Sequence, residues 1–133
     1  MANWFPWKSK LTRFKTKILN KGQAAEQQAA SYLSKQGLRL IEQNYHCRRG
    51  EIDLICKQGD TWVFVEVKYR KSLSHGGAAA AVDQHKMHRI LLSAQHYLQQ
   101  KNLNQFDTAM RFDVVAIQEQ APYLEWFQNA FGE

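Results

Sequence analysis

Two closely spaced apolar runs stand out in the pattern of hydrophobic and polar positions along the chain. Most positions in residues 52–56 and in residues 62–67 are apolar, and β-branched residues are frequent among them. Gly59 and Asp60 lie between the runs and are typical of a hairpin turn. Because both runs are apolar at consecutive positions, we expect strands that are covered on both faces. The pattern therefore predicts a central β-hairpin over residues 50–70.

Helical spacing of apolar residues predicts one helix before this hairpin and one after it. In residues 22–36, alanine, tyrosine and leucine recur every three or four positions, and Gly37 occupies the place of a C-terminal cap. In residues 79–101 the same spacing predicts a longer helix. Its apolar face comprises Val82, Met87, Ile90, Leu91, Ala94, Tyr97 and Leu98.

The remaining segments are predicted to complete a mixed sheet. Residues 38–45 are expected to form the first strand. Residues 110–117 suit a buried strand, and because a strand–helix–strand connection is a crossover, this strand should run parallel to the one that contains Glu66. Residues 123–131 should close the domain as a short strand or a helical turn. The predicted fold is α/β, in the order α-β-β-β-α-β, with helices on both faces of the sheet. The expected core residues of the first strand are Leu38, Leu40 and Ile41.

Positive charge is concentrated at the start of the chain. The formal net charge is +6, and residues 1–21 hold six basic residues and no acid, whereas residues 22–133 hold twelve of each sign. We therefore expect a basic flexible arm, residues 1–21, followed by a single domain, residues 22–133. The arm could bind phosphates, lie on an anionic membrane surface as a short amphipathic helix, or be a solvated tail.

The apolar content gives an expectation about the compartment. No apolar run reaches the roughly 18 residues of a membrane span, and no secretory signal follows the basic start. The two cysteines, Cys47 and Cys56, have no spacing typical of a zinc site. We expect a cytoplasmic protein without a membrane partner or an organic cofactor.

Four charged residues interrupt the predicted hairpin, and its register places them. A turn centred on Gly59–Asp60 pairs residues whose numbers sum to 119. That register sets Asp53 opposite Glu66, and it sets Glu51 opposite Lys68. Directly opposed side chains have Cβ atoms roughly 4.5–5.5 Å apart. Asp53 and Glu66 could then share a hard cation such as Mg²⁺, and Lys68 could act on a bound phosphate or an attacking water.

An explanation without a metal is equally compatible with this spacing. Glu51 would form a salt bridge with Lys68, and Asp53 would accept a hydrogen bond from a neighbouring backbone N–H. Structural ion-pair networks gather charges much as functional sites do. Spacing alone leaves both explanations open.

Several motifs, taken in order, resemble one family of small bacterial proteins. They are Gly50-Glu51-Ile52-Asp53-Leu54-Ile55, Val63-Phe64-Val65-Glu66-Val67-Lys68-Tyr69-Arg70, Gly76-Gly77 with Lys86, and Arg111-Phe112-Asp113-Val114-Val115. This set is similar to the YraN-like family, which resembles the restriction-endonuclease-like PD-(D/E)XK nucleases and Holliday-junction resolvases in particular. The resemblance covers nearly the whole chain after the arm. One departure is Ile52, which stands where the superfamily pattern has a proline before the first acid.

The resemblance implies an activity and a set of site residues. The implied activity is hydrolysis of phosphodiester bonds in DNA, branched or otherwise non-duplex, by an endonuclease that uses Mg²⁺ or Mn²⁺. Asp53 and Glu66 would bind the metal, with Glu51 as an outer candidate ligand, and Lys68 would be catalytic. Glu26 would add a catalytic carboxylate from the first helix. From spacing alone, Glu26 is equally an acid that suits the helix dipole.

Basic residues around the hairpin are the candidate DNA contacts. Arg48 and Arg49 precede the hairpin, and Arg70 and Lys71 follow it. The resemblance makes Lys86 a candidate phosphate contact on the long helix, although its position alone indicates only a surface lysine. Each of these residues is also compatible with an ordinary exposed turn or helix.

Three further expectations concern function and neighbouring residues. The alternative function is a DNA-binding or assembly module that keeps the fold without significant catalysis. Junction resolvases act through paired sites, so a homodimer is compatible with the resemblance. Asp113 is expected to bind Arg111 or a backbone amide rather than the metal. The polar loop of residues 69–77 is expected to lie over the substrate.

Overall fold

The computed structural model describes residues 20–71 and 83–131. Most of the predicted arm, the glycine pair at 76–77 and residues 79–82 of the predicted long helix lie outside these ranges. Neither helix in the described ranges is long and apolar enough to cross a membrane. The elements are α2 (Lys21–Lys35), β1 (Arg39–Cys47), β2 (Gly50–Gln58), β3 (Thr61–Arg70), α3 (Gln84–Gln100), β4 (Met110–Gln118) and β5 (Leu124–Phe131).

The strands form one mixed sheet in the order β1-β2-β3-β4-β5. Strands β3 and β4 are parallel, as predicted for a crossover through α3, and the other neighbours are antiparallel. The predicted order omitted the last strand. The segment from Leu124 to Phe131 pairs with β4 and adds a fifth strand at the edge.

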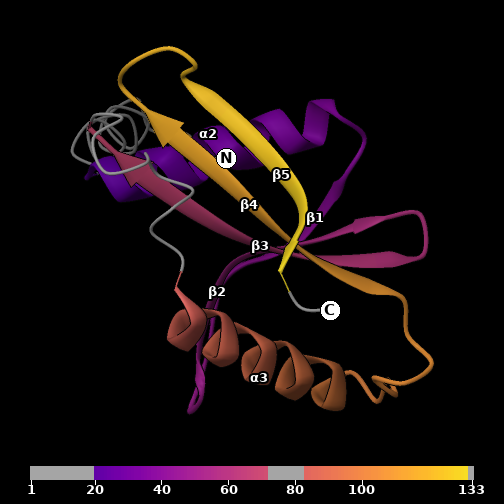
Figure 1. Ribbon diagram of the computed structural model, residues 1–133. Helices are drawn as coiled ribbons and strands as arrows, with labels where there is room; N and C mark the ends of the chain where they lie inside the picture. Colours follow the sequence, from indigo (N-terminus) through magenta and orange to yellow (C-terminus); the bar gives the residue numbers. More distant parts are fainter. Residues whose placement is uncertain (1–19, 72–82, 132–133) are drawn as a thin grey trace, which may run out of the picture.

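Each face of the sheet carries one helix and one apolar cluster (Figure 1). On one face, Ala29 and Leu33 of α2 pack with Val65 of β3. On the other face, Tyr97 of α3 packs with Phe64, and their rings lie 6.2 Å apart in an edge-to-face arrangement. Burying an aliphatic or aromatic side chain of this size stabilises a fold by roughly 1.5–3 kcal/mol. The prediction that β2 and β3 are covered on both faces is confirmed.

A capping box begins α2, and a glycine follows its end. The side chain of Asn20 accepts a hydrogen bond from the Gln23 amide, and the Gln23 side chain accepts one from the Asn20 amide. This capping box satisfies amides that a helix start leaves unpaired. Lys21, which the charge pattern assigns to the arm, is therefore the first residue of α2. At the other end, Gly37 follows the helix with a φ of +97°, as its sequence position predicted.

Strand β1 is less buried than its apolar pattern predicted. Leu38 is buried, but Leu40 and Ile41 are each 36% exposed, so their placement in the core was wrong. Two features explain the difference. Strand β1 lies at the edge of the sheet, and its register shifts between Leu40 and Glu42, which indicates a bulge.

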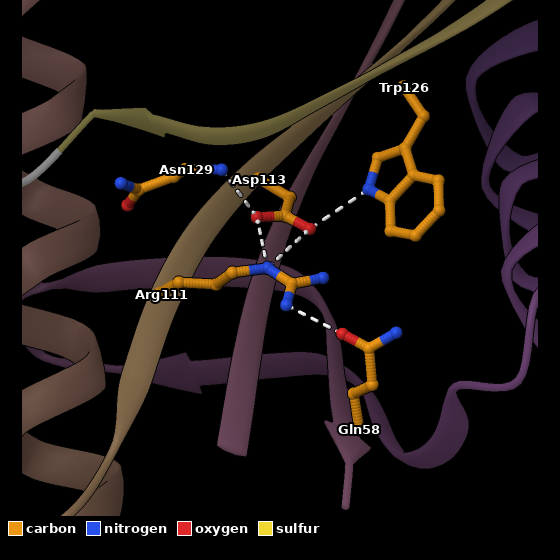
Figure 2. A network of polar contacts seen from close by, with 5 residues as sticks. All are labelled: Gln58, Arg111, Asp113, Trp126 and Asn129. Carbon is orange, nitrogen blue, oxygen red and sulfur yellow. Dashed lines mark hydrogen bonds and ion pairs between the residues drawn. The ribbon is translucent and has the colours of Figure 1, made fainter.

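A buried polar network attaches β5 to the rest of the sheet (Figure 2). Asp113 is fully buried and accepts hydrogen bonds from the Arg111 Nε, the Trp126 indole and the Asn129 amide, at 2.9–3.2 Å. Arg111 Nη1 also donates to Gln58 at 2.6 Å, whereas its Nη2 is buried without a partner among the described residues. The predicted partners of Asp113, Arg111 and a backbone amide, are both confirmed.

Candidate active site

Strands β2 and β3 separate at a point that we call the fork, defined by Asp53 and Val67. Up to Leu54, which pairs with Val65, the hairpin has the predicted register. The ladder between the two strands ends there. Beyond it, the Val67 amide donates to Oδ2 of Asp53 at 2.8 Å. The side chain of Asp53 therefore replaces a main-chain partner where the strands diverge.

Two carboxyl groups, those of Asp53 and Glu66, are in contact at the fork, and we call them the acid pair. Asp53 is 8% exposed and Glu66 is 3% exposed. Burial and repulsion from Glu66 raise the pKa of Asp53 to about 8, although the Val67 hydrogen bond opposes this shift. Asp53 is therefore mainly protonated at pH 7, and its hydroxyl can donate to the Glu66 carboxylate. The predicted meeting of these two acids is confirmed.

Two lysines bind Glu66. The Nζ atoms of Lys68 and Lys86 lie 3.2 Å and 2.9 Å from the same oxygen, Oε2. Burial, reinforced by contact with Lys86, lowers the pKa of Lys68 despite the attraction of Glu66. Burial would also lower the pKa of Lys86, but its bonds to Glu66 and Lys68 outweigh this effect and raise it. Lys86 is thus a direct partner of the acid pair and not only a surface lysine.

The position of Lys86 depends on how α3 begins. Asp83 is the N-cap residue of α3, and its side chain accepts a hydrogen bond from the Lys86 amide at 2.8 Å. This cap fixes the first turn of the helix. The position of this first helical turn places the Lys86 ammonium beside Glu66.

Glu26 approaches the acid pair from α2. Burial raises the pKa of Glu26, the negative charges of Glu51 and Glu66 raise it further, and a hydrogen bond with Asn44 lowers it. Asn44 lies in β1 with a left-handed φ of 52°, which asparagine adopts more readily than most residues. The structure thus brings Glu26 within electrostatic range of Glu66. It also adds Asn44, which no sequence pattern had indicated.

Glu51 does not lie where the sequence predicted. Its placement opposite Lys68 was wrong because the ladder between β2 and β3 ends before that pair is reached. Instead, Glu51 pairs with His46 across β1 and β2, and its carboxylate lies 3.1 Å from His46 Nδ1. The side chain of Glu51 is 55% exposed. The metal-free explanation was therefore right about the Asp53–amide bond and wrong about the Glu51–Lys68 bridge.

A pocket of about 250 Å³, which we call the basic pocket, opens between the β1–β2 turn and the start of α3. Lys86 lines this pocket and also binds Glu66, so the basic pocket borders the acid pair. Arg49 lines a separate, smaller pocket beside His96. The residues around the basic pocket are His46, Cys47, Arg48, Gly50, Glu51, Lys86, Arg89 and Ile90.

The other predicted DNA contacts lie at the end of β3. Arg70 is the last residue of that strand and Lys71 follows it, and both are exposed. Lys71 contributes to a neighbouring cluster in which Glu119 binds Lys21 and Tyr69. Hydrogen bonds from Lys21 and Tyr69, and then the charges of Lys21 and Lys71, lower the pKa of Glu119.

The donor set of the acid pair fits a hard divalent cation with few protein ligands. Mg²⁺ prefers oxygen ligands and commonly takes one or two carboxylates, with water and substrate phosphate completing its shell. Asp53 and Glu66 offer two carboxylates whose mutual repulsion a cation would relieve. Within residues 20–71 and 83–131, no three His, Cys, Asp or Glu side chains are arranged to hold a metal by themselves. The residues therefore fit a two-carboxylate site.

The sequence matches one protein family over most of its length. The model of "Uncharacterised protein family UPF0102" matches residues 25–117, which include both members of the acid pair and both lysines. A UPF0102 protein from Colwellia psychrerythraea is 49% identical over 127 residues, covering 94% of this chain and 98% of the relative. A UPF0102 protein from Aeromonas hydrophila is 52% identical over 112 residues, covering 84% of this chain and 85% of the relative.

A third relative is also similar over almost the whole chain. A UPF0102 protein from Psychromonas ingrahamii is 48% identical over 124 residues, covering 93% of this chain and 99% of the relative. The chain therefore belongs to the UPF0102 family, the YraN-like family that its motifs resemble.

Proposed function

We propose that the protein is a metal-dependent endonuclease that hydrolyses phosphodiester bonds in DNA, branched or otherwise non-duplex, with Mg²⁺ or Mn²⁺. We further propose that its mixed sheet and two helices form a restriction-endonuclease-like fold and that it acts in the cytoplasm. The acid pair is the observation that carries this proposal. Asp53 keeps a pKa of about 8 in contact with Glu66, and strongly shifted groups of this kind are concentrated at functional sites.

Each residue of the site has a role suited to its environment. Asp53 and Glu66 would hold the cation, after Asp53 has lost its proton. A bound divalent cation supplies polarisation of a phosphoryl oxygen and a lowered pKa for a bound water. Lys68, with its lowered pKa, is suited to orient the attacking water or accept its proton. Lys86 is more firmly protonated and is suited to hold the phosphate.

One observation favours the alternative, a DNA-binding or assembly module without significant catalysis. Glu66 is already neutralised by the Lys68 and Lys86 ammonium groups, so the carboxylate does not need a metal for its charge to be tolerated. A buried ion pair can be retained for the specificity it gives a fold. This alternative predicts the same geometry but no response to a divalent cation.

Calorimetric titration with Mg²⁺ or Mn²⁺ separates the two functions. We expect binding by the wild-type protein and loss of binding in Glu66→Gln, because the variant removes one of two carboxylate ligands. Cleavage of branched and linear DNA, followed in parallel, should fall at least about 100-fold in Glu66→Gln, whereas DNA binding measured in EDTA should change little.

Glu125→Gln is the matched control, because it removes the same charge from β5, outside the site. It should bind metal and cut DNA like the wild-type protein. Equal cleavage by wild type and Glu66→Gln would exclude a catalytic acid pair. Absence of both metal binding and cleavage in the wild-type protein, with DNA still bound, would leave the module as the function.

A further inference from the structure

The basic pocket holds two arginines that lack an acidic partner in the part of the chain that the structure describes. Lys86 is already paired with Glu66, and Glu51 lies 3.1 Å from His46, which is charged only when it is protonated. Arg48 and Arg89 form no salt bridge with any residue in the described ranges. These two arginines therefore give the pocket a net positive charge, because Glu51 is the one acid among the lining residues that the structure describes.

Gly50 allows the β1–β2 turn and helix α3, which form the wall of this pocket, to approach closely. It has a φ of +152°, and a side chain at this position would place its Cβ 3.2 Å from the Ser93 hydroxyl and 3.5 Å from the Arg89 Cβ. A glycine thus permits the β1–β2 turn to rest against α3. Arg89 is fixed by the same approach, because its Nε donates to the Arg49 carbonyl at 3.3 Å. The Nη groups of Arg89 make no hydrogen bond within the described residues, so they can donate to a ligand.

We propose that the basic pocket binds the terminal phosphate of a nucleic-acid strand. A phosphate monoester carries a charge of about −1.5 to −2 at pH 7 and has three strong acceptor oxygens, so it offers the two arginines more charge and more acceptors than an internal diester with its single charge. Guanidinium groups bind phosphate through parallel N–H donors, so Arg48 and Arg89 suit this ligand better than lysines would. The helix start does not provide this site by itself, because Asp83 already caps it.

The size of the pocket is consistent with a strand end. Its volume of about 250 Å³ lies below the roughly 300–1,000 Å³ typical of pockets for drug-sized ligands. A phosphate with its sugar fits such a space, whereas a base-paired duplex end does not. This inference rests on the proposed nuclease function and narrows its substrate class to DNA with an accessible phosphorylated end, positioned through Lys86 beside the acid pair.

The test measures binding of strand ends separately from cleavage. Full-length protein is titrated in EDTA, by fluorescence anisotropy, into internally labelled single strands that carry a 5′-phosphate, a 3′-phosphate or only hydroxyl ends. We expect one phosphorylated end to improve affinity about 10-fold. Arg48→Gln and Arg89→Gln should each reduce this preference to about twofold or less. Arg89→Lys should lose part of it, because lysine keeps the charge but not the paired donors.

Two controls exclude a simple charge effect. A hydroxyl-ended strand that is one nucleotide longer has the same number of phosphates as the phosphorylated strand. Arg39→Gln removes a positive charge from the far end of β1, and it should weaken binding to all strands alike. Thermal unfolding of each variant verifies that it is folded.

The outcomes separate this inference from the nuclease proposal. Equal affinity for phosphorylated and hydroxyl ends in the wild-type protein would overturn the inference, as would an equal loss of preference in Arg39→Gln. If metal-dependent cleavage is nevertheless observed, the nuclease proposal stands without it. A phosphate preference that depends on Arg48 and Arg89, with no cleavage, would retain the pocket and overturn the nuclease proposal.

Discussion

Asp53 and Asp113 lie on the two strands that flank β3, and both are buried, yet their surroundings differ. Asp113 accepts hydrogen bonds from Arg111, Trp126 and the Asn129 amide. Asp53 accepts one amide hydrogen bond and faces a second carboxyl group, that of Glu66. The same chemical group is thus paired with hydrogen-bond donors and a cation on one side of β3 and held against another acid on the other side.

This difference indicates which network stabilises the fold and which is available for function. Buried polar groups in proteins are nearly always paired, so an acid with complete pairing is adequately explained by structure. An acid that keeps a proton at pH 7 because it is buried and faces a second acid destabilises the ionised site, and such local conflicts are found at functional sites. The Asp113 network should therefore control stability, and the acid pair should control chemistry.

The largest effect is expected from Asp113→Asn. The variant leaves the Arg111 guanidinium, which is mostly buried, without its anionic partner, and breaking a buried pair in this way costs about 3–5 kcal/mol of unfolding free energy. Urea denaturation measures the loss, with Glu125→Gln as the control for removal of a half-buried acid outside this network. A loss below about 1 kcal/mol would be no larger than that of a typical surface ion pair. The Asp113 network would then not be the main source of stability, and the proposed difference from Asp53 would be wrong.

Asp53→Asn should have the opposite sign and stabilise the protein. The pKa of Asp53 is about 8 in the folded chain and near 3.8 in the unfolded chain, so the folded state binds its proton more tightly between these values. Wild-type stability is therefore lost as the pH rises through this window and levels off above about 8. The amide side chain avoids this loss, and we expect a gain of about 1–3 kcal/mol at pH 8.

The comparison at two pH values is the decisive part of that experiment. The advantage of Asp53→Asn over the wild-type protein in urea denaturation should be larger at pH 8 than at pH 5. An advantage that is independent of pH, or a variant less stable than wild type at pH 8, would show that Asp53 is satisfied in the same way as Asp113.

Divalent cation affinity should rise with pH up to about 8. If Asp53 must lose its proton to act as a ligand, Mg²⁺ or Mn²⁺ binding is weakened about tenfold for each pH unit below that value. Calorimetry in buffers of different ionisation enthalpy measures both the affinity and the proton released. Affinity that does not change between pH 6 and pH 8 would argue against Asp53 as a metal ligand.

Trp126→Phe should produce the smallest effect. The variant keeps most of the ring that packs on the α2 face and removes only the indole donor to Asp113, so we expect a loss of about 1–2 kcal/mol. Cleavage, if present, should be unchanged in the folded protein. An equal loss of activity and stability would indicate that the two networks are coupled across β3.

Local features of the sequence predicted the fold best. The turn at Gly59 and Asp60 determined the hairpin register, and the crossover through α3 required β4 to be parallel to β3. Leu40 and Ile41 were misplaced because their burial depends on which strand lies at the edge, and no property of residues 38–45 determines that position. The last strand was uncertain for the same reason, because β5 is held by its contacts with Asp113 rather than by its own pattern.

The site was predictable only where it depended on the hairpin. Asp53 and Glu66 lie one position beyond the last paired residues, Leu54 and Val65, and still meet as the register predicted. Glu51 was misplaced because the strands diverge beyond that point. The proximity of Lys86 to Glu66 depends on where α3 begins after a long connection, and only the family resemblance suggested it. Asn44 and the two unpaired arginines meet other elements through tertiary contacts that sequence spacing does not encode.

Strand β3 pairs with β2 on one edge and with β4 on the other, so its length has consequences for both acids. A single inserted residue near Val63 would turn Glu66 toward the α2 face, because side chains alternate along a strand. It would also change which β3 residue lies opposite Asp113, a position that Val65 now occupies. An insertion at the Gly59–Asp60 turn is also risky, because this turn sets the hairpin register and Gln58 beside it binds Arg111. The exposed connection between α3 and β4, around Phe106, sets neither register. Homologues should therefore differ in length at that connection, and engineered insertions or reporter tags should be tolerated there and not within β3.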